Sequence, residues 1–154
     1  MTSKPQHATI KLEHRYSAPV ERVFSEFADP VARARWSAPS NDALIYDEAD
    51  FRVGGKDVFR CGPKGDPKFR GETRYLHIVA NAQVVSSEAV EMDGQHLAVA
   101  LMTLDFEPTD DGTNLTVTVQ IVSFSGPDMI HGYESGNKSA LNNLSHYLSN
   151  SSHT

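Results

Sequence analysis

The chain has 154 residues and a formal net charge of −6 at pH 7, and 39% of its residues are hydrophobic. The acidic balance argues against a nucleic-acid-binding surface, which is usually basic, and no apolar stretch approaches the roughly 18 residues that a membrane-spanning helix needs. The N-terminus lacks the apolar region of a secretory signal, and the single cysteine, Cys61, cannot form an internal disulfide. We therefore expect one cytoplasmic domain, 1–154, in which residues 1–7 are flexible.

The first expected element is a strand from Ala8 to Tyr16, because polar and apolar residues alternate there. Two short helices follow. The first begins near Pro19, since proline suits the first helical turn, and it ends at Asp29-Pro30, because a residue before proline is disfavoured in a helix. The second helix spans about Val31 to Trp36.

Strands separated by turn residues fill the chain from Ala43 to Phe124. Asp93-Gly94 stands between two alternating runs, and this pairing is a strong indication of a hairpin. Consecutive hairpins indicate an antiparallel sheet. The expected strands are Leu44–Phe51, Asp57–Cys61, Phe69–Val79, Val84–Met92, His96–Phe106 and Asn114–Phe124.

The last expected element is a long helix from Asp128 to Ser149, where apolar residues recur every three or four positions. Burying each larger apolar side chain of that face contributes roughly 1.5–3 kcal/mol before entropy is subtracted. A twisted sheet of about seven strands supplies the surface, because it curls around a helix on its concave face. The predicted fold class is α+β: a curved antiparallel sheet around a long C-terminal helix, with two short helices at one end.

Several local motifs occur in order along this framework. They are SAPVERVFSEFADPVARARW from Ser17, DFRVGG from Asp50, FRCGP from Phe59, YLHIV from Tyr75, DGTNLTV from Asp111 and HGYESG from His131. Their order and spacing resemble the START-like superfamily, also called helix-grip or SRPBCC. Within it they are similar to the branch named for the activator of the ninety-kilodalton heat-shock chaperone's ATPase. The resemblance covers roughly Ala8 to Ser149 and implies a helix-grip fold with a cavity between sheet and helix.

The register of the central strands decides which side chains face that cavity. Glu72 and Arg74 lie on one face of the strand Phe69–Val79, and Tyr75 lies on the other face. In the preceding strand, Phe59 and Cys61 share a face. The simpler arrangement puts the charges in water. The alternative buries Glu72 against an arginine, where the pair could hold a polar ligand or move a proton. Bulges shift the register, so both arrangements stay open.

Other cavity candidates come from the helices. Tyr133 and Asn137 share the inward face of the long helix, and a buried polar side chain there needs a ligand, a water or the sheet as its partner. The resemblance places Trp36 near the cavity mouth, and Met102 offers adaptable apolar lining. The predicted ligand-binding residues are Trp36, Phe59, Cys61, Glu72, Tyr75, Met102, Tyr133 and Asn137.

Three hypotheses for function follow. The leading one is non-catalytic binding of a small hydrophobic, aromatic or polyketide-like molecule, with no metal and no cofactor. The second is a cyclase-type enzyme that uses Glu72, His131 or Tyr133 as an acid or base on a carbonyl compound. The third is a chaperone-interaction module. The eukaryotic co-chaperone carries a further N-terminal domain that contributes to chaperone binding, whereas this sequence starts directly at its first strand, and this difference argues against a co-chaperone role. A homodimer, formed through sheet edges or helices as in some relatives, stays open.

Overall fold

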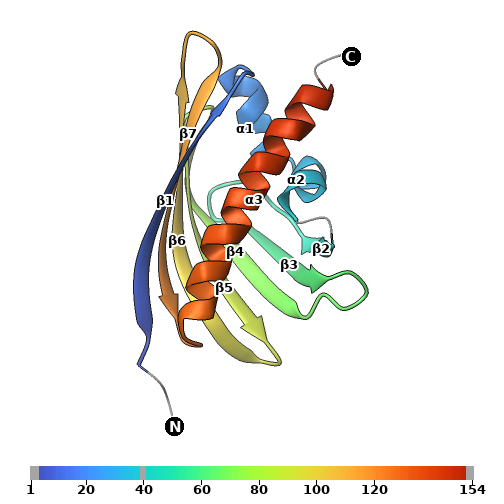
Figure 1. Ribbon diagram of the computed structural model, residues 1–154, viewed down its shortest axis with the longest axis vertical. Helices are drawn as coiled ribbons and strands as arrows, with labels where there is room; N and C mark the ends of the chain where they lie inside the picture. Colours follow the sequence, from blue (N-terminus) through green and yellow to red (C-terminus); the bar gives the residue numbers. More distant parts are fainter. Residues whose placement is uncertain (1–3, 39–40, 152–154) are drawn as a thin grey trace.

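The computed structural model describes residues 4–38 and 41–151. Its elements follow the order expected from the sequence (Figure 1). They are β1 (Gln6–Tyr16), α1 (Val20–Ala28), α2 (Pro30–Ser37), β2 (Asp42–Glu48), β3 (Lys56–Pro63), β4 (Phe69–Val79), β5 (Gln83–Met92), β6 (Gln95–Pro108), β7 (Thr113–Ser123) and α3 (Pro127–Ser151). Within the described ranges, no helix is long and apolar enough to cross a membrane.

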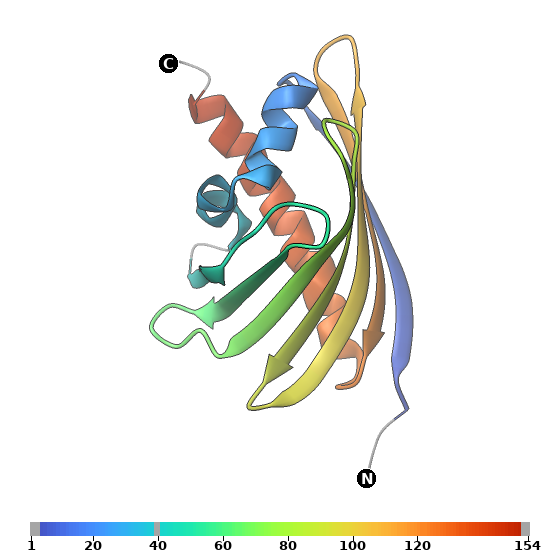
Figure 2. The ribbon, with the colours of Figure 1, turned by 180° about the vertical axis from the view of Figure 1, so that it is seen from behind.

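The strands form one sheet of seven in the order β1-β7-β6-β5-β4-β3-β2, and every neighbouring pair is antiparallel. Strands β1 and β2 therefore lie at opposite edges, and α1 and α2 connect them. Helix α3 crosses the concave face of the sheet (Figure 1). From behind, α1 and α2 gather near the C-terminal end of α3 (Figure 2). This arrangement confirms the predicted α+β helix-grip fold.

Most element boundaries lie one or two residues from the predicted ones, and the differences at the end of β2 and the start of β1 change which segments belong to the sheet. Strand β2 ends at Glu48, so Phe51 lies in the following loop rather than in a strand. The reason is a change of pairing partner, because Gly54 donates its N–H to Tyr75 and Gly55 accepts one from Tyr75. Strand β1 begins at Gln6, inside the segment expected to be flexible, of which residues 1–3 lie outside the described residues.

The core lies between the C-terminal half of α3 and the strands β1, β6 and β7. The predicted alternation of β7 is present, since Leu115, Val117, Val119 and Ile121 are buried. From the helix they meet an apolar stripe in which Leu144 is completely buried. The fully buried apolar side chains of α3 lie in this half, whereas Met129, Ile130 and Tyr133 in the N-terminal half pack against the core only in part.

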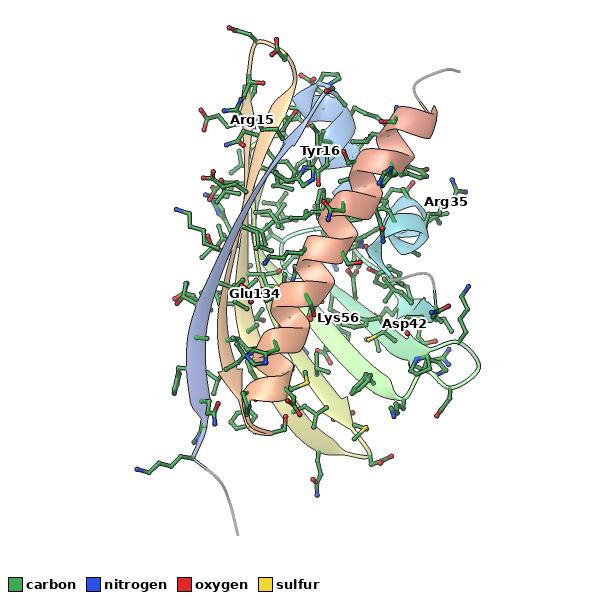
Figure 3. All side chains as sticks on the ribbon, in the orientation of Figure 1. Arg15, Tyr16, Arg35, Asp42, Lys56 and Glu134 are labelled. Atoms are coloured by element: carbon green, nitrogen blue, oxygen red, sulfur yellow. The ribbon has the colours of Figure 1, made fainter. Side chains whose placement is uncertain are left out.

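Tyr16, labelled in Figure 3, connects β1 to α3 at the same end. Its hydroxyl donates to the main-chain oxygen of Leu141 at 2.9 Å. Nearby, Phe27 of α1 packs edge-on against Trp36 of α2 and Phe106 of β6, with ring centroids 4.8 and 5.5 Å apart. These contacts close one end of the space under the helix.

We expect Gly71→Ala to lower the free energy of unfolding by about 1–3 kcal/mol, the usual cost of overpacking. Phe59 is the cross-strand partner of Gly71, and a Cβ atom at Gly71 would stand 2.1 Å from Cζ of its ring. Urea unfolding measures the difference. Gly136→Ala in α3 is the control, because its Cβ would meet nothing within 4 Å. It should stabilise the protein by about 0.5–1 kcal/mol. Equal urea midpoints for Gly71→Ala and the wild type would contradict this packing.

Candidate ligand cavity

A cavity of about 740 Å³ lies between the sheet and helices α2 and α3. Internal ligand sites usually have volumes of roughly 300–1,000 Å³, with mostly apolar walls and a few polar groups. This cavity fits that description, because aromatic and aliphatic side chains make up most of its wall. The aromatic part of the wall includes Trp36, Tyr46, Phe51, Phe59, Phe69 and Tyr75. Asp42, at the start of β2, also lines it (Figure 3).

Arg33 fixes α2 against the sheet beside the cavity. Its Nη1 donates to Asp57 Oδ2 at 3.0 Å and to the hydroxyl oxygen of Tyr75 at 2.6 Å. Tyr75 in turn donates its hydroxyl to the Asp57 carboxylate. The guanidinium also lies over the ring of Tyr46, with 4.8 Å between Cζ and the ring centroid. Asp57 is 1% exposed, so Arg33 supplies the opposite charge that a buried carboxylate needs.

Glu88 lies on the inward face of β5, where its neighbours Val84 and Val90 are buried. It lines the cavity, so its partial exposure is to the cavity interior. Its Oε1 accepts a hydrogen bond from the Tyr133 hydroxyl at 2.8 Å, and its Oε2 accepts one from the Thr73 hydroxyl at 3.3 Å. Burial raises the pKa of Glu88, and it outweighs these two hydrogen bonds, which favour the charged form.

Helix α3 presents small residues to the cavity on either side of Tyr133. Gly132 and Gly136 line the cavity, and a Cβ atom at either position would meet nothing within 4 Å. Burial and the neighbouring Glu88 raise the pKa of Tyr133 well above its usual value, so its hydroxyl stays protonated as a donor. One turn along, Asn137 donates its side-chain amide to the Tyr133 carbonyl oxygen at 2.7 Å.

Cys61 lines the cavity but is not an activated thiol. Burial, together with the charge of Glu88, raises the pKa of Cys61 to about 11. A thiol of that pKa holds its proton at neutral pH and is a poor nucleophile or metal ligand. In the part of the chain that the structure describes, no group of three or more His, Cys, Asp or Glu side chains is arranged to hold a metal ion.

The structure places most of the predicted binding residues in the cavity wall. Those that line it are Trp36, Phe59, Cys61, Tyr75, Met102, Tyr133 and Asn137. They come from α2, β3, β4, β6 and α3, which approach one another only in the folded chain. Their role in binding a ligand stays a prediction.

The placement of Glu72 in the cavity is wrong. Glu72 is absent from the lining, and its Oε1 lies 2.6 Å from Arg74 Nη2 in an ion pair whose two side chains are 37% and 59% exposed. On the other register of β4, Thr73 and Tyr75 are buried. The charges thus lie in water, where they avoid the cost of desolvation. His131, the second acid–base candidate, is also exposed and outside the lining.

The sequence analysis missed Glu88, Arg33 and Asp57. Glu88 shares the inward register of β5 with Val84 and Val90, so alternation alone could have indicated an inward acid. Asp57 likewise shares a register with Phe59. Arg33 had no comparable indication, because α2 is short and weakly amphipathic.

The sequence also matches a known protein family. Residues 17–149 match the family described as Activator of Hsp90 ATPase homolog 1-like protein. The chain belongs to this family. The AHSA1-like family lies within the START-like superfamily, whose helix-grip fold the structure shows. A search of curated proteins finds no match.

Solved structures of similar chains extend the comparison. The Mll3558 protein from Rhizobium loti is 33% identical and has a TM-score of 0.83, over 94% of this chain and 99% of its own. An uncharacterized protein from Rhizobium leguminosarum is 27% identical with a TM-score of 0.85, over 96% and 97% of the two chains. The AHSA1 protein from Silicibacter pomeroyi, at 18% identity and a TM-score of 0.77 over 92% and 98%, shares the fold.

We expect Glu88→Gln to stabilise the AHSA1-like chain relative to the wild type increasingly as the pH rises from about 4.5 to neutral. The usual pKa of the side chain is 4.5, and burial raises it in the folded protein. Below both pKa values the Glu88 side chain is protonated in the folded and in the unfolded protein, so it does not change the stability. Above 4.5 the unfolded chain ionises first, so the penalty on folding grows with pH and becomes constant once the pH passes the raised pKa of the folded protein.

Urea unfolding at a series of pH values measures this difference. Glutamine has nearly the same shape, accepts one hydroxyl hydrogen bond through its oxygen and can donate to the other hydroxyl through its amide, but it never ionises. Glu72→Gln makes the same change of charge on the outer face and serves as the control. If the stability difference between Glu88→Gln and the wild type were independent of pH, the Glu88 carboxyl would not be held in a desolvated site.

Proposed function

We propose that the protein binds a small, largely apolar molecule in the cavity between α3 and strands β3, β4 and β5. The observation that carries this proposal is a cavity of about 740 Å³ with a mainly apolar wall and a few polar groups, among them Glu88 and Tyr133. Such a wall desolvates the apolar part of a ligand, while the polar groups fix its orientation. The START-type fold of the family is consistent with a ligand-binding domain.

The N-terminal half of α3 supports this proposal. Glycine inside a helix is less favourable than alanine by about 0.5–1 kcal/mol, and neither Gly132 nor Gly136 is required by a close neighbour. Both glycines face the cavity. Their effect is to keep its volume open at the expense of helix stability, which fits a site that accepts a molecule.

Native mass spectrometry of the freshly purified protein tests the proposal. We expect a bound organic molecule that is released on denaturation, or uptake of an added apolar probe such as 1-naphthol. Gly136→Leu, which places a side chain of four carbons in the cavity, should weaken binding. Ser135→Leu adds the same side chain to an exposed position of the same helix and should bind as the wild type does. A wild-type protein that neither retains a molecule nor takes up the probe would contradict the proposal.

A second candidate function, acid–base catalysis on a carbonyl compound, is favoured by the contact between Glu88 and Tyr133. A carboxylate whose pKa is raised by burial is a better general base near neutral pH than an ordinary one. Tyr133 holds that carboxylate in place through a hydrogen bond of 2.8 Å. Because Glu72 and His131 lie outside the cavity lining, Glu88 takes the role that the cyclase hypothesis gave to them.

Hydrogen exchange of 2-tetralone in deuterated water checks this second candidate. If Glu88 removes the proton next to the carbonyl group, the wild type should accelerate loss of that proton signal in the NMR spectrum. Glu88→Gln should lower the acceleration by about 100-fold, the usual contribution of a general base. Glu72→Gln is the control. Exchange at the wild-type rate in Glu88→Gln would rule Glu88 out as the base.

The family's name concerns activation of a chaperone ATPase. The cavity geometry bears on small-molecule binding only, so the chaperone-interaction hypothesis stays a prediction. A pull-down of the protein with the purified chaperone tests this hypothesis directly.

A further inference from the structure

Glu88 is an acidic group in an apolar cavity that receives only neutral hydrogen-bond donors. The hydroxyls of Tyr133 and Thr73 each donate to one of its oxygens. Among residues 4–38 and 41–151, no lysine, arginine or histidine forms an ion pair with it. A buried carboxylate is stabilised most by an opposite charge that also donates a hydrogen bond. No described residue supplies such an opposite charge to Glu88.

The nearby arginine does not fill it. Arg33 donates to Asp57 and Tyr75 and stacks on Tyr46, so its charge is already compensated. Arg33 lowers the pKa of Glu88 and Asp57 raises it, so part of the arginine's effect on Glu88 is offset by its own ion-pair partner. The pair therefore anchors α2 without serving as a counter-ion for Glu88.

The aromatic part of the cavity wall favours a positive group over a negative one. The faces of aromatic rings carry partial negative charge and attract cations. Two rings of this wall already do so within the protein, since Arg33 lies over Tyr46 at 4.8 Å and the Lys68 ammonium lies over Phe69 at 6.0 Å. Arg33 and Lys68 line the cavity, as do the acids Asp42 and Glu88, so the two signs are balanced in number. The local contacts of Glu88, which include no ion pair among the described residues, therefore carry the choice of a positive group.

Two nitrogens of Arg33, Nε and Nη2, have no hydrogen-bond partner within the described part of the chain, and unpaired guanidinium nitrogens would favour an anion. Both atoms are fully buried. A molecule in the cavity therefore cannot reach them unless α2 moves and the ion pair with Asp57 is disturbed. Glu88, by contrast, is accessible from the cavity.

We propose that the cavity takes a lipophilic or aromatic amine, whose ammonium group pairs with the Glu88 carboxylate while its apolar part lies among the aromatic rings. This inference rests on the proposed binding function and names its ligand class. Binding forms an ion pair and, where Glu88 was protonated beforehand, releases that proton to the solvent. Tyr133 and Thr73 keep their hydrogen bonds to the carboxylate, which still has a lone pair on each oxygen for the ammonium.

Three probes with one apolar part test the inference: 4-phenylbutylamine, 4-phenylbutanol and 4-phenylbutyrate. Isothermal titration calorimetry at neutral pH measures their affinities for the wild type, Glu88→Gln and Glu72→Gln. We expect the amine to bind the wild type about tenfold or more tightly than the alcohol, as a charge-assisted hydrogen bond implies. The carboxylate should bind most weakly. Glu88→Gln should remove the preference for the amine, so that the amine and the alcohol bind this variant with similar affinities. Glu72→Gln, which makes the same change of net charge, should behave as the wild type does.

The outcomes separate this inference from the function on which it rests. Equal binding of amine and alcohol to the wild type, or an amine preference that survives in Glu88→Gln, would overturn the amine inference while cavity binding stands. Tightest binding of the carboxylate would overturn it too and would point to Arg33. If none of the three probes binds the wild type, both the inference and the proposed function fail. The wild-type comparison needs no variant, so the test holds even if Glu88→Gln does not fold.

Discussion

The ion pair between Arg33 and Asp57 is the interaction on which the shape of the cavity depends. It joins α2 to β3, and Tyr75 extends it to β4. The Asp57 side chain is only 1% exposed, and removing a carboxylate from water costs several kcal/mol unless a partner compensates for it. Asp57 also accepts the main-chain N–H of Asp50 at 3.2 Å, which holds the loop that carries Phe51 into the wall. One buried carboxylate thus fixes the helix, two strands and a loop around the same space.

The cavity region contains two buried acids whose surroundings push them towards different behaviour. Asp57 is paired with an arginine, whereas among the described residues Glu88 receives hydrogen bonds from two hydroxyl groups, and burial raises its pKa. Pairs of acids in contrasting environments commonly divide their tasks in this way. Asp57 holds α2 and the neighbouring loop in position around the cavity. Glu88 lines the cavity, so its carboxyl group can contact a molecule inside. The proposed binding, the acid–base alternative and the amine inference all depend on this difference.

The sequence predicted the fold well because the evidence for each element is local. Alternation identified β7, helical spacing identified α3, and turn residues separated the strands between them. The residues of the cavity wall were harder to predict, because they depend on which face of each strand is turned towards α3. For β4 the two registers were recognised but not distinguished, and Glu72 proved to lie on the outer one. Glu88 was overlooked although the inward alternation of β5 contains it, since only the approach of Tyr133 across the cavity makes it a site. The cavity volume could not be predicted, because it depends on how far α3 stands from the sheet.

Trp36 gives the protein an optical property that follows from its position. It is the single tryptophan of the chain, it is 3% exposed, and it lines the cavity beside Phe27. Its indole Nε1 has no hydrogen-bond partner among the described residues. Indole emission shifts with the polarity of the surroundings, so the intrinsic fluorescence of the protein originates at the wall of the space where a ligand would lie. Filling that space with an organic molecule in place of solvent changes the light emitted by the chain itself, and no label is needed to detect occupancy.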